Sequence, residues 1–108
     1  MLFSVTTTEH GDGTKRVYFN GVEAWDDFDL ILNILSKEKG FNVLSNSEML
    51  YIREAVLERK GMELHLKHDD ILGSFLYTRQ SEEVPLLEQL AHSVIDSIVR
   101  KIEEKGRL

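Results

Sequence analysis

Four neighbouring side chains, those of His65, His68, Asp69 and Asp70, are of the types that bind metal ions. The run 62–68 alternates apolar and polar residues, which predicts a strand that ends just before the two aspartates. Side chains three positions apart on a strand point to opposite faces, so the two histidines cannot share an ion unless the strand end is distorted. We therefore expect His65 to be exposed and His68 to help build a turn with the aspartates. The sequence predicts neither a metal ion nor a cofactor.

The other histidines lack the neighbours that catalysis requires. The glycine-rich run 10–14, which begins at His10, has no Lys-Ser/Thr pair and joins two predicted strands, so it is a hairpin turn and not a phosphate loop. His92 is followed by Ser93, but adjacent residues on a helix do not face each other. Neither histidine predicts a nucleophilic site.

Glu54, Glu58 and Glu63 raise the idea of paired carboxylates across a hairpin, as in a glycosidase. Such a pair also needs a cleft large enough for a sugar. Glu58 and Glu63 flank a turn that contains Arg59 and Lys60, which is typical of surface charge. We therefore predict that the protein is not an enzyme.

The first part of the chain predicts a hairpin followed by a helix. Two β-rich runs, 2–9 and 15–20, flank the glycine-rich turn. The next run, 22–39, changes to helical spacing and is followed by Gly40, a natural C-terminal stop. Leu30 and Ile34 fall outside its apolar stripe, so this helix is either covered on two sides or presents apolar surface to a partner. The stripe itself consists of Trp25, Phe28, Leu32 and Leu35, with Ile31 beside them.

The second part predicts strands and then a long helix. Helical sequence signals start at Ser81, with acidic residues and a proline in the first turn, and the stripe that begins at Leu87 extends to the last residues. The run 49–59 is interpreted as a strand, with a helix as the alternative, because the next strand needs a pairing partner. The expected segments are a short strand at 41–44, a loop at 45–47, strands at 49–59 and 62–68, and a central strand at 71–78.

These segments predict one α+β domain over residues 1–108. Strands joined by tight turns pair antiparallel, and the two amphipathic helices must bury their apolar stripes. We expect a two-layer sandwich in which an antiparallel sheet of about five strands carries both helices on one face. The element order is β-β-α-β-β-β-β-α or similar.

The charge balance bears on the partners. The chain has 19 acidic and 13 basic side chains and a formal charge of −6, which argues against nucleic acid as a partner. It has no cysteine, which excludes disulfides, a thiolate nucleophile and cysteine-based zinc sites. No signal peptide and no membrane span is recognised, so we expect a cytoplasmic protein with no membrane partner.

The acidic residues beside the first helix are the best interaction signal. The helix dipole accounts for Glu23 and Asp26, but Asp27 and Asp29 exceed what it requires. Further acidic side chains come from predicted turns. The predicted partner-binding residues are Glu23, Trp25, Asp26, Asp27, Asp29, Asp69 and Asp70.

In size, in acidity and in its lack of catalytic motifs, the chain resembles bacterial immunity proteins, which neutralise a co-encoded toxin such as a nuclease. These inhibitors span many unrelated folds, so the resemblance assigns no residue. It implies a basic protein partner, whose nuclease site would be occluded by acidic groups in place of phosphates. Aromatic anchors such as Phe19, Trp25 or Tyr77 would supply desolvated contacts where they are exposed.

Three other interpretations stay open. A secretion chaperone or dimeric adaptor would use the surplus apolar residues of the first helix, Leu30 and Ile34. A small enzyme or ligand-binding domain would build an unrecognised site from His65, His68, Asp69 or His92. A structural or phage-encoded domain would carry no readable site. The oligomeric state, monomer or dimer, is left open.

Overall fold

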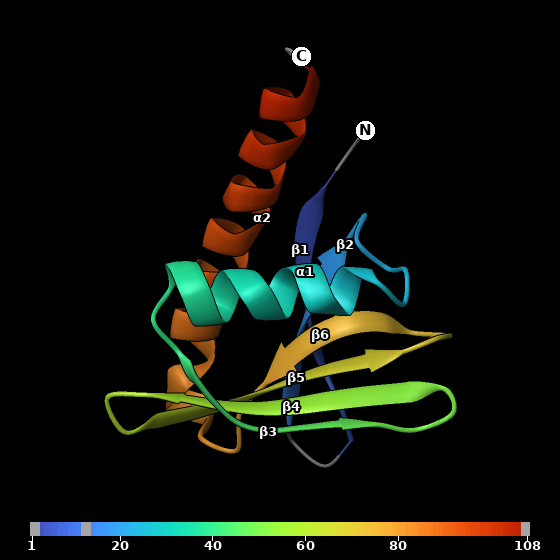
Figure 1. Ribbon diagram of the computed structural model, residues 1–108. Helices are drawn as coiled ribbons and strands as arrows, with labels where there is room; N and C mark the ends of the chain where they lie inside the picture. The colour runs from blue at the N-terminus through green and yellow to red at the C-terminus, as the bar shows by residue number, and fades with distance from the viewer. Residues whose placement is uncertain (1–2, 12–13, 107–108) are drawn as a thin grey trace.

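The computed structural model describes residues 3–11 and 14–106 (Figure 1). Asp12 and Gly13 of the expected first turn lie outside the described residues. The elements follow one another as β1 (Ser4–Glu9), β2 (Lys15–Asn20), α1 (Asp27–Asn33), η1 (Ile34–Glu38), β3 (Asn42–Glu48), β4 (Ile52–Arg59), β5 (Met62–Asp69), β6 (Gly73–Tyr77), η2 (Ser81–Glu83) and α2 (Val84–Gly106).

The strands form one antiparallel sheet in the order β1-β2-β6-β5-β4-β3, so the α+β class is confirmed. The sheet has six strands instead of about five. The short strand expected at 41–44 forms as β3, which extends to Glu48 and so includes Ser45, Asn46 and Ser47, the residues interpreted as a loop. Every residue of β3 is exposed, so the strand shows no alternation between apolar and polar positions that a sequence pattern could reveal.

Both helices lie on the same side of the sheet (Figure 1). α2 packs on β1, β2 and β6, and α1 lies over β5. The core between the layers is built from fully buried residues of helices and strands. Among them are Phe28, Ile31, Leu35, Leu57, Leu64, Leu66, Leu76, Leu87, Val94 and Ile98.

The first helix is shorter than expected and changes its winding. α1 continues into the π-helical turn η1, in which the Lys39 amide donates to the carbonyl of Ile34 at 3.1 Å. The chain then leaves the helix at Gly40, whose φ of +78° suits glycine. Ile34 is buried and Leu30 is half-buried, so the structure covers the helix on two sides.

Strands β4 and β6 begin later than the apolar pattern predicted. The run 49–59 is a strand and not a helix, but β4 begins only at Ile52. The predicted strand 71–78 is central as expected, but β6 begins at Gly73. Apolar residues of both runs therefore lie in turns. Within the described part of the chain, no helix has the length and hydropathy needed to cross a bilayer.

Candidate binding surface at the hairpin end

The β3–β4 and β5–β6 turns meet at one end of the sheet. Ile52 pairs with Asp69 across β4 and β5, which places the two turns side by side. The Asp70 amide also donates to the carbonyl of Tyr51 at 3.2 Å. The loop that leads into α1 reaches the same end, because a Cβ atom at Gly73 would lie 3.3 Å from Cγ of Glu23.

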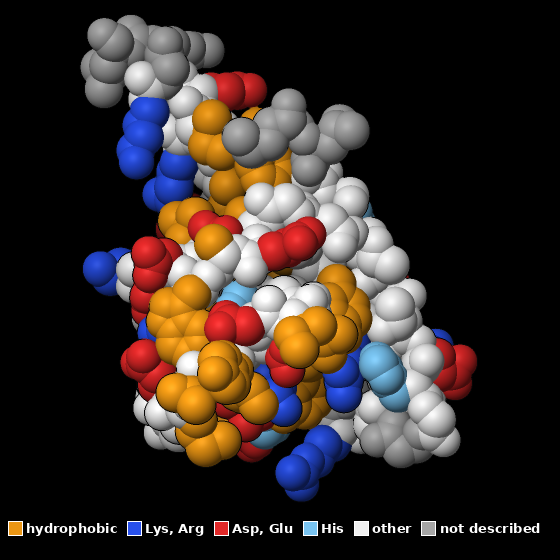
Figure 2. All heavy atoms as spheres, turned by 90° about the vertical axis from the view of Figure 1, so that its right-hand side faces the viewer, with side chains coloured by type: hydrophobic (Ala, Val, Ile, Leu, Met, Phe, Trp, Pro, Cys, Tyr) orange, Lys and Arg blue, Asp and Glu red, His pale blue; other side chains and the backbone are white. Residues whose placement is uncertain are grey.

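Large apolar side chains project from both turns. Their exposed fractions range from 50 % at Leu72 to 91 % at Ile71. Figure 2 shows this end of the molecule, where hydrophobic side chains gather in neighbouring groups with acidic side chains beside them. Clustered apolar surface of this kind marks interaction sites more often than isolated exposed residues do. We call the five residues Met49, Leu50, Tyr51, Ile71 and Leu72 the hairpin-tip patch.

Hydrogen bonds hold both turns in place. The amide of Met49 donates to the carbonyl of Ile52 at 2.8 Å and closes the β3–β4 turn. In the other turn, one carboxylate oxygen of Asp69 accepts from the amides of Ile71 at 2.8 Å and Leu72 at 3.2 Å. A short polar side chain that satisfies following amides is a common turn device. The predicted site residue Asp69 therefore shapes the turn that presents part of the patch.

Arg53 joins the start of α1 to the hairpin end. Its guanidinium donates two hydrogen bonds to the carboxylate of Asp29, at 2.9 and 2.7 Å, and lies over the rings of Trp25 and Phe28. The hydrogen bond from Arg53 holds the pKa of Asp29 below its ordinary value. In the sequence, Asp29 exceeded what the helix dipole requires, because its partner Arg53 lies 24 positions away in the chain.

Trp25 and Asp70 both contact the buried His68. The indole ring meets the imidazole edge-on, with 5.6 Å between the ring centroids. The Nε2 atom of His68 lies 3.2 Å from the carboxylate of Asp70, and its Nδ1 atom lies 2.9 Å from the hydroxyl of Ser74. The expectation that His68 serves as a turn residue is wrong, because it is fully buried beneath the turn.

Six carboxylates surround the patch. Glu23 and Asp26 come from the loop before α1, and Glu48 comes from the end of β3, opposite Arg53. Arg53 itself is buried and already paired with Asp29. This end is therefore apolar at the tips and negative around them. We call Glu23, Asp26, Asp29, Glu48, Asp69 and Asp70 the acidic rim.

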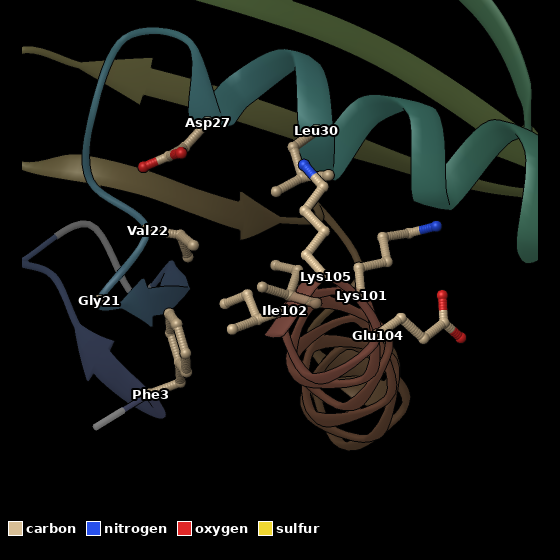
Figure 3. A pocket seen from close by; sticks show the side chains of 10 residues that line it. Phe3, Gly21, Val22, Asp27, Leu30, Lys101, Ile102, Glu104 and Lys105 are labelled. Carbon is tan, nitrogen blue, oxygen red and sulfur yellow. The ribbon is translucent and has the colours of Figure 1, made fainter. Parts of the chain in front are cut away.

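Asp27 is the predicted site residue that the structure places elsewhere. Its carboxylate accepts from the Ala24 amide at 2.9 Å, which stabilises the turn before α1. It lines a separate cavity between the start of α1, the β1–β2 hairpin and the last turns of α2 (Figure 3). Six of the seven predicted residues therefore share the hairpin end, and Asp27 does not.

The cavity beside Asp27 has a volume of about 530 Å³. Phe3, Val22 and Ile102 turn their side chains toward its interior, and Lys101 and Glu104 point away from it (Figure 3). Lys101 forms an ion pair with Glu38 at 3.1 Å. The cavity therefore offers apolar contact, and its lining includes no histidine or hydroxyl side chain among the described residues.

A polar cluster occupies the sheet face opposite the helices. The hydroxyl of Tyr77 donates to Glu54, and the imidazole of His65 stacks on the Tyr77 ring with 4.6 Å between centroids. The two ring nitrogens of His65 lie 3.5 Å from Glu54 and 3.5 Å from Glu63. Burial, together with Glu54, raises the pKa of Tyr77 to about 12. The expectation that His65 is exposed is wrong, since 12 % of its side chain is accessible.

Of the side chains suggested for a catalytic or metal site, Glu54 and Glu63 lie beside His65, but His68 and His92 do not join them. His65 and His68 face opposite sides of the sheet, as the spacing predicted, and His92 is exposed on α2. Glu58 accepts from the Gly61 amide at 2.8 Å, so it shapes its own turn. Within residues 3–11 and 14–106, no group of three His, Asp or Glu side chains could hold a metal ion.

The hairpin-tip patch was missed at the level of sequence. Its residues, Met49 to Tyr51 and Ile71 to Leu72, were predicted to be in strands, because they are continuous with the apolar runs 49–59 and 71–78. One signal was present in the sequence: Asp69, Asp70 and Gly73 are residue types that favour turns. In the structure Gly73 has a φ of +87°, which suits glycine. No protein-family model, curated protein or solved structure matches the chain.

Proposed function

We propose that the protein binds another protein through the hairpin-tip patch and the acidic rim. The observation that carries this proposal is that five large apolar side chains are at least half exposed at one end of a folded domain. Exposed apolar side chains gain free energy when a partner removes them from water. Tyrosine and the long aliphatic side chains can serve as anchors in a partner's pockets.

The acidic rim defines the chemistry of the partner. Carboxylates around an apolar centre attract a basic surface and raise the association rate, whereas buried apolar contact slows dissociation. We propose a partner with basic side chains around an apolar depression, such as a nuclease domain. The protein would act as an immunity-type inhibitor that covers the partner's active site. Its small size and its acidic charge support this role.

Affinity capture from the native host tests the surface. The baits are the wild type, the double variant Leu50→Ser/Ile71→Ser, and the control Leu86→Ser, which changes a half-exposed leucine on α2. We expect the wild type and the control to retain a basic protein that the double variant loses. A protein retained equally by all three baits would remove the hairpin-tip patch from the interface.

Charge variants test the rim once the captured protein is purified. Asp26→Asn/Glu48→Gln removes two rim charges, and Glu103→Gln/Glu104→Gln removes two exposed charges from the far end of α2. The rim variant should slow association by roughly two- to tenfold at low salt, and the control should not. Inhibition is tested by the captured protein's own activity, nuclease cleavage first, with and without one equivalent of this chain. If the captured protein keeps its full activity in the complex, the inhibitor role is contradicted and only the proposal of binding stands.

A further inference from the structure

The two edge strands of the sheet, β1 and β3, differ in how far other elements cover them. β1, at one edge, packs against α2, and its Thr7 hydroxyl donates to Glu88 of that helix at 2.5 Å. β3, at the other edge, pairs with β4 alone, and all seven of its residues are exposed. β3 follows the lower edge of the sheet in Figure 1. An exposed edge strand is a template on which another strand can pair.

The direction of the free backbone groups follows from the β3–β4 turn. The Met49 amide donates to the Ile52 carbonyl, so these residues occupy a hydrogen-bonded position of the ladder. Bonded and non-bonded pairs alternate along an antiparallel ladder, so Ser47 and Ser45 direct their backbone groups toward β4. Asn46 and Glu48 therefore direct their amides and carbonyls away from the sheet. The register shift at Leu44 lies before this stretch, which leaves Ser45–Glu48 regular.

β3 also lacks the usual protection of an edge. Lysine, proline and inward-pointing charges commonly block strand addition, and β3 contains no lysine or proline. Its first six residues, 42–47, carry no charge although the whole chain is at −6. Val43 and Leu44 are 40 % and 57 % exposed, so pairing would remove apolar surface from water. The bulge at Leu44 and the carboxylate of Glu48 are the protective devices that the strand does carry.

We propose that β3 pairs antiparallel with β3 of a second copy of this chain and joins two sheets into one. With the two-fold axis at Asn46, the outward amides and carbonyls of the two Asn46 residues satisfy each other. Ser45 then lies opposite Ser47 of the second copy, and Glu48 lies opposite the bulge at Leu44. This register faces no carboxylate with another, so an acidic chain can associate here with itself. The proposal does not depend on the proposed function.

Sedimentation velocity over a concentration series tests the dimer with the protein alone. We expect the wild type to pass from monomer to dimer as the concentration rises. Asn46→Pro removes the outward amide without removing a bond to β4, so it should raise the dimer Kd by more than about tenfold. Asn46→Ala is the matched control: it keeps the amide and should dimerise to within a few-fold of the wild type.

A second variant keeps the test decisive if the proline disturbs folding. Asn46→Lys keeps the backbone amide but places two like charges opposite each other at the axis, and Leu86→Lys adds the same charge to α2. We expect the Asn46→Lys variant to be monomeric and the Leu86→Lys control to dimerise. Wild-type protein that stays monomeric at the highest soluble concentration overturns the proposal. So do folded Asn46→Pro and Asn46→Lys variants that dimerise as tightly as wild type.

Discussion

Leucines occupy two opposite environments in this protein. Leu66, on the central strand β5, is fully buried between the sheet and the helices, whereas Leu50, at the tip of the β3–β4 turn, is 80 % exposed. The same side chain therefore stabilises the fold at one position and leaves apolar surface in water at the other. Folding explains the first leucine and does not require the second. The contrast separates residues kept for packing from residues that are available for contact.

Truncation of the buried leucine should have the largest effect. Leu66→Ala removes buried methyl groups and leaves a cavity, so we expect the free energy of unfolding to fall by about 2–5 kcal/mol. Chemical denaturation followed by circular dichroism measures this value. A loss below about 1 kcal/mol would mean that the core around β5 is loosely packed, and the contrast between the buried Leu66 and the exposed Leu50 would not hold.

Removal of Arg53 should have the next largest effect. Arg53→Ala leaves Asp29 without its two hydrogen bonds and exposes the rings of Trp25 and Phe28. Hydrogen bonds to charged groups suggest a loss of roughly 1.5–3 kcal/mol, with the lower end favoured because the Asp29 side chain is half exposed. Asp29→Asn should cost less than Arg53→Ala. Equal unfolding curves for wild type and Arg53→Ala would show that α1 is positioned without this pair.

The Arg53–Asp29 pair also predicts a dependence on pH. The pKa of Asp29 is lower in the folded state, so the pair stabilises the protein above the ordinary aspartate pKa, and this contribution disappears as the pH falls through the folded value. The stability difference between wild type and Asp29→Asn should therefore be largest near neutral pH and shrink below about pH 4. Thermal unfolding of both proteins across the acid range checks it. A stability difference between the two proteins that increases as the pH falls would contradict the lowered pKa of Asp29 in the folded state.

The exposed leucine should have the smallest effect on stability. Leu50→Ala makes the same chemical change as Leu66→Ala, and the free energy of unfolding should change by no more than about 0.5 kcal/mol. The same denaturation experiment measures both variants. A loss comparable with that of Leu66→Ala would show that the hairpin-tip patch is part of the core, and the proposed interface would lose its basis.

Periodic patterns predicted the buried half of this fold well. The stripe of α2 from Leu87 onward repeats at helical spacing because one face packs on the sheet, and β5 alternates because its two faces meet different surroundings. β3 gave no such pattern, since both of its faces and one edge meet water. Ser45 to Ser47 were therefore interpreted as a loop. Sequence patterns report burial, so an exposed strand leaves little trace.

The candidate site was predictable where its residues are neighbours in the sequence. Glu23, Trp25 and Asp26 stand together in the chain, and the cluster was visible without a structure. Leu50 and Ile71 are 21 positions apart and come together only through the pairing of β4 with β5, which fixes both turns at one end. The partnership of Asp29 with Arg53 was hidden for the same reason.

The hydrogen bonds that close the two turns have a consequence for association. Asp69 fixes Ile71 and Leu72, and the Met49–Ile52 bond limits Leu50 and Tyr51 to one short connection. Backbone that is already ordered before contact loses little conformational entropy on contact. The apolar tips therefore approach a partner as a preorganised shape, and binding loses less conformational entropy than it would with mobile turns.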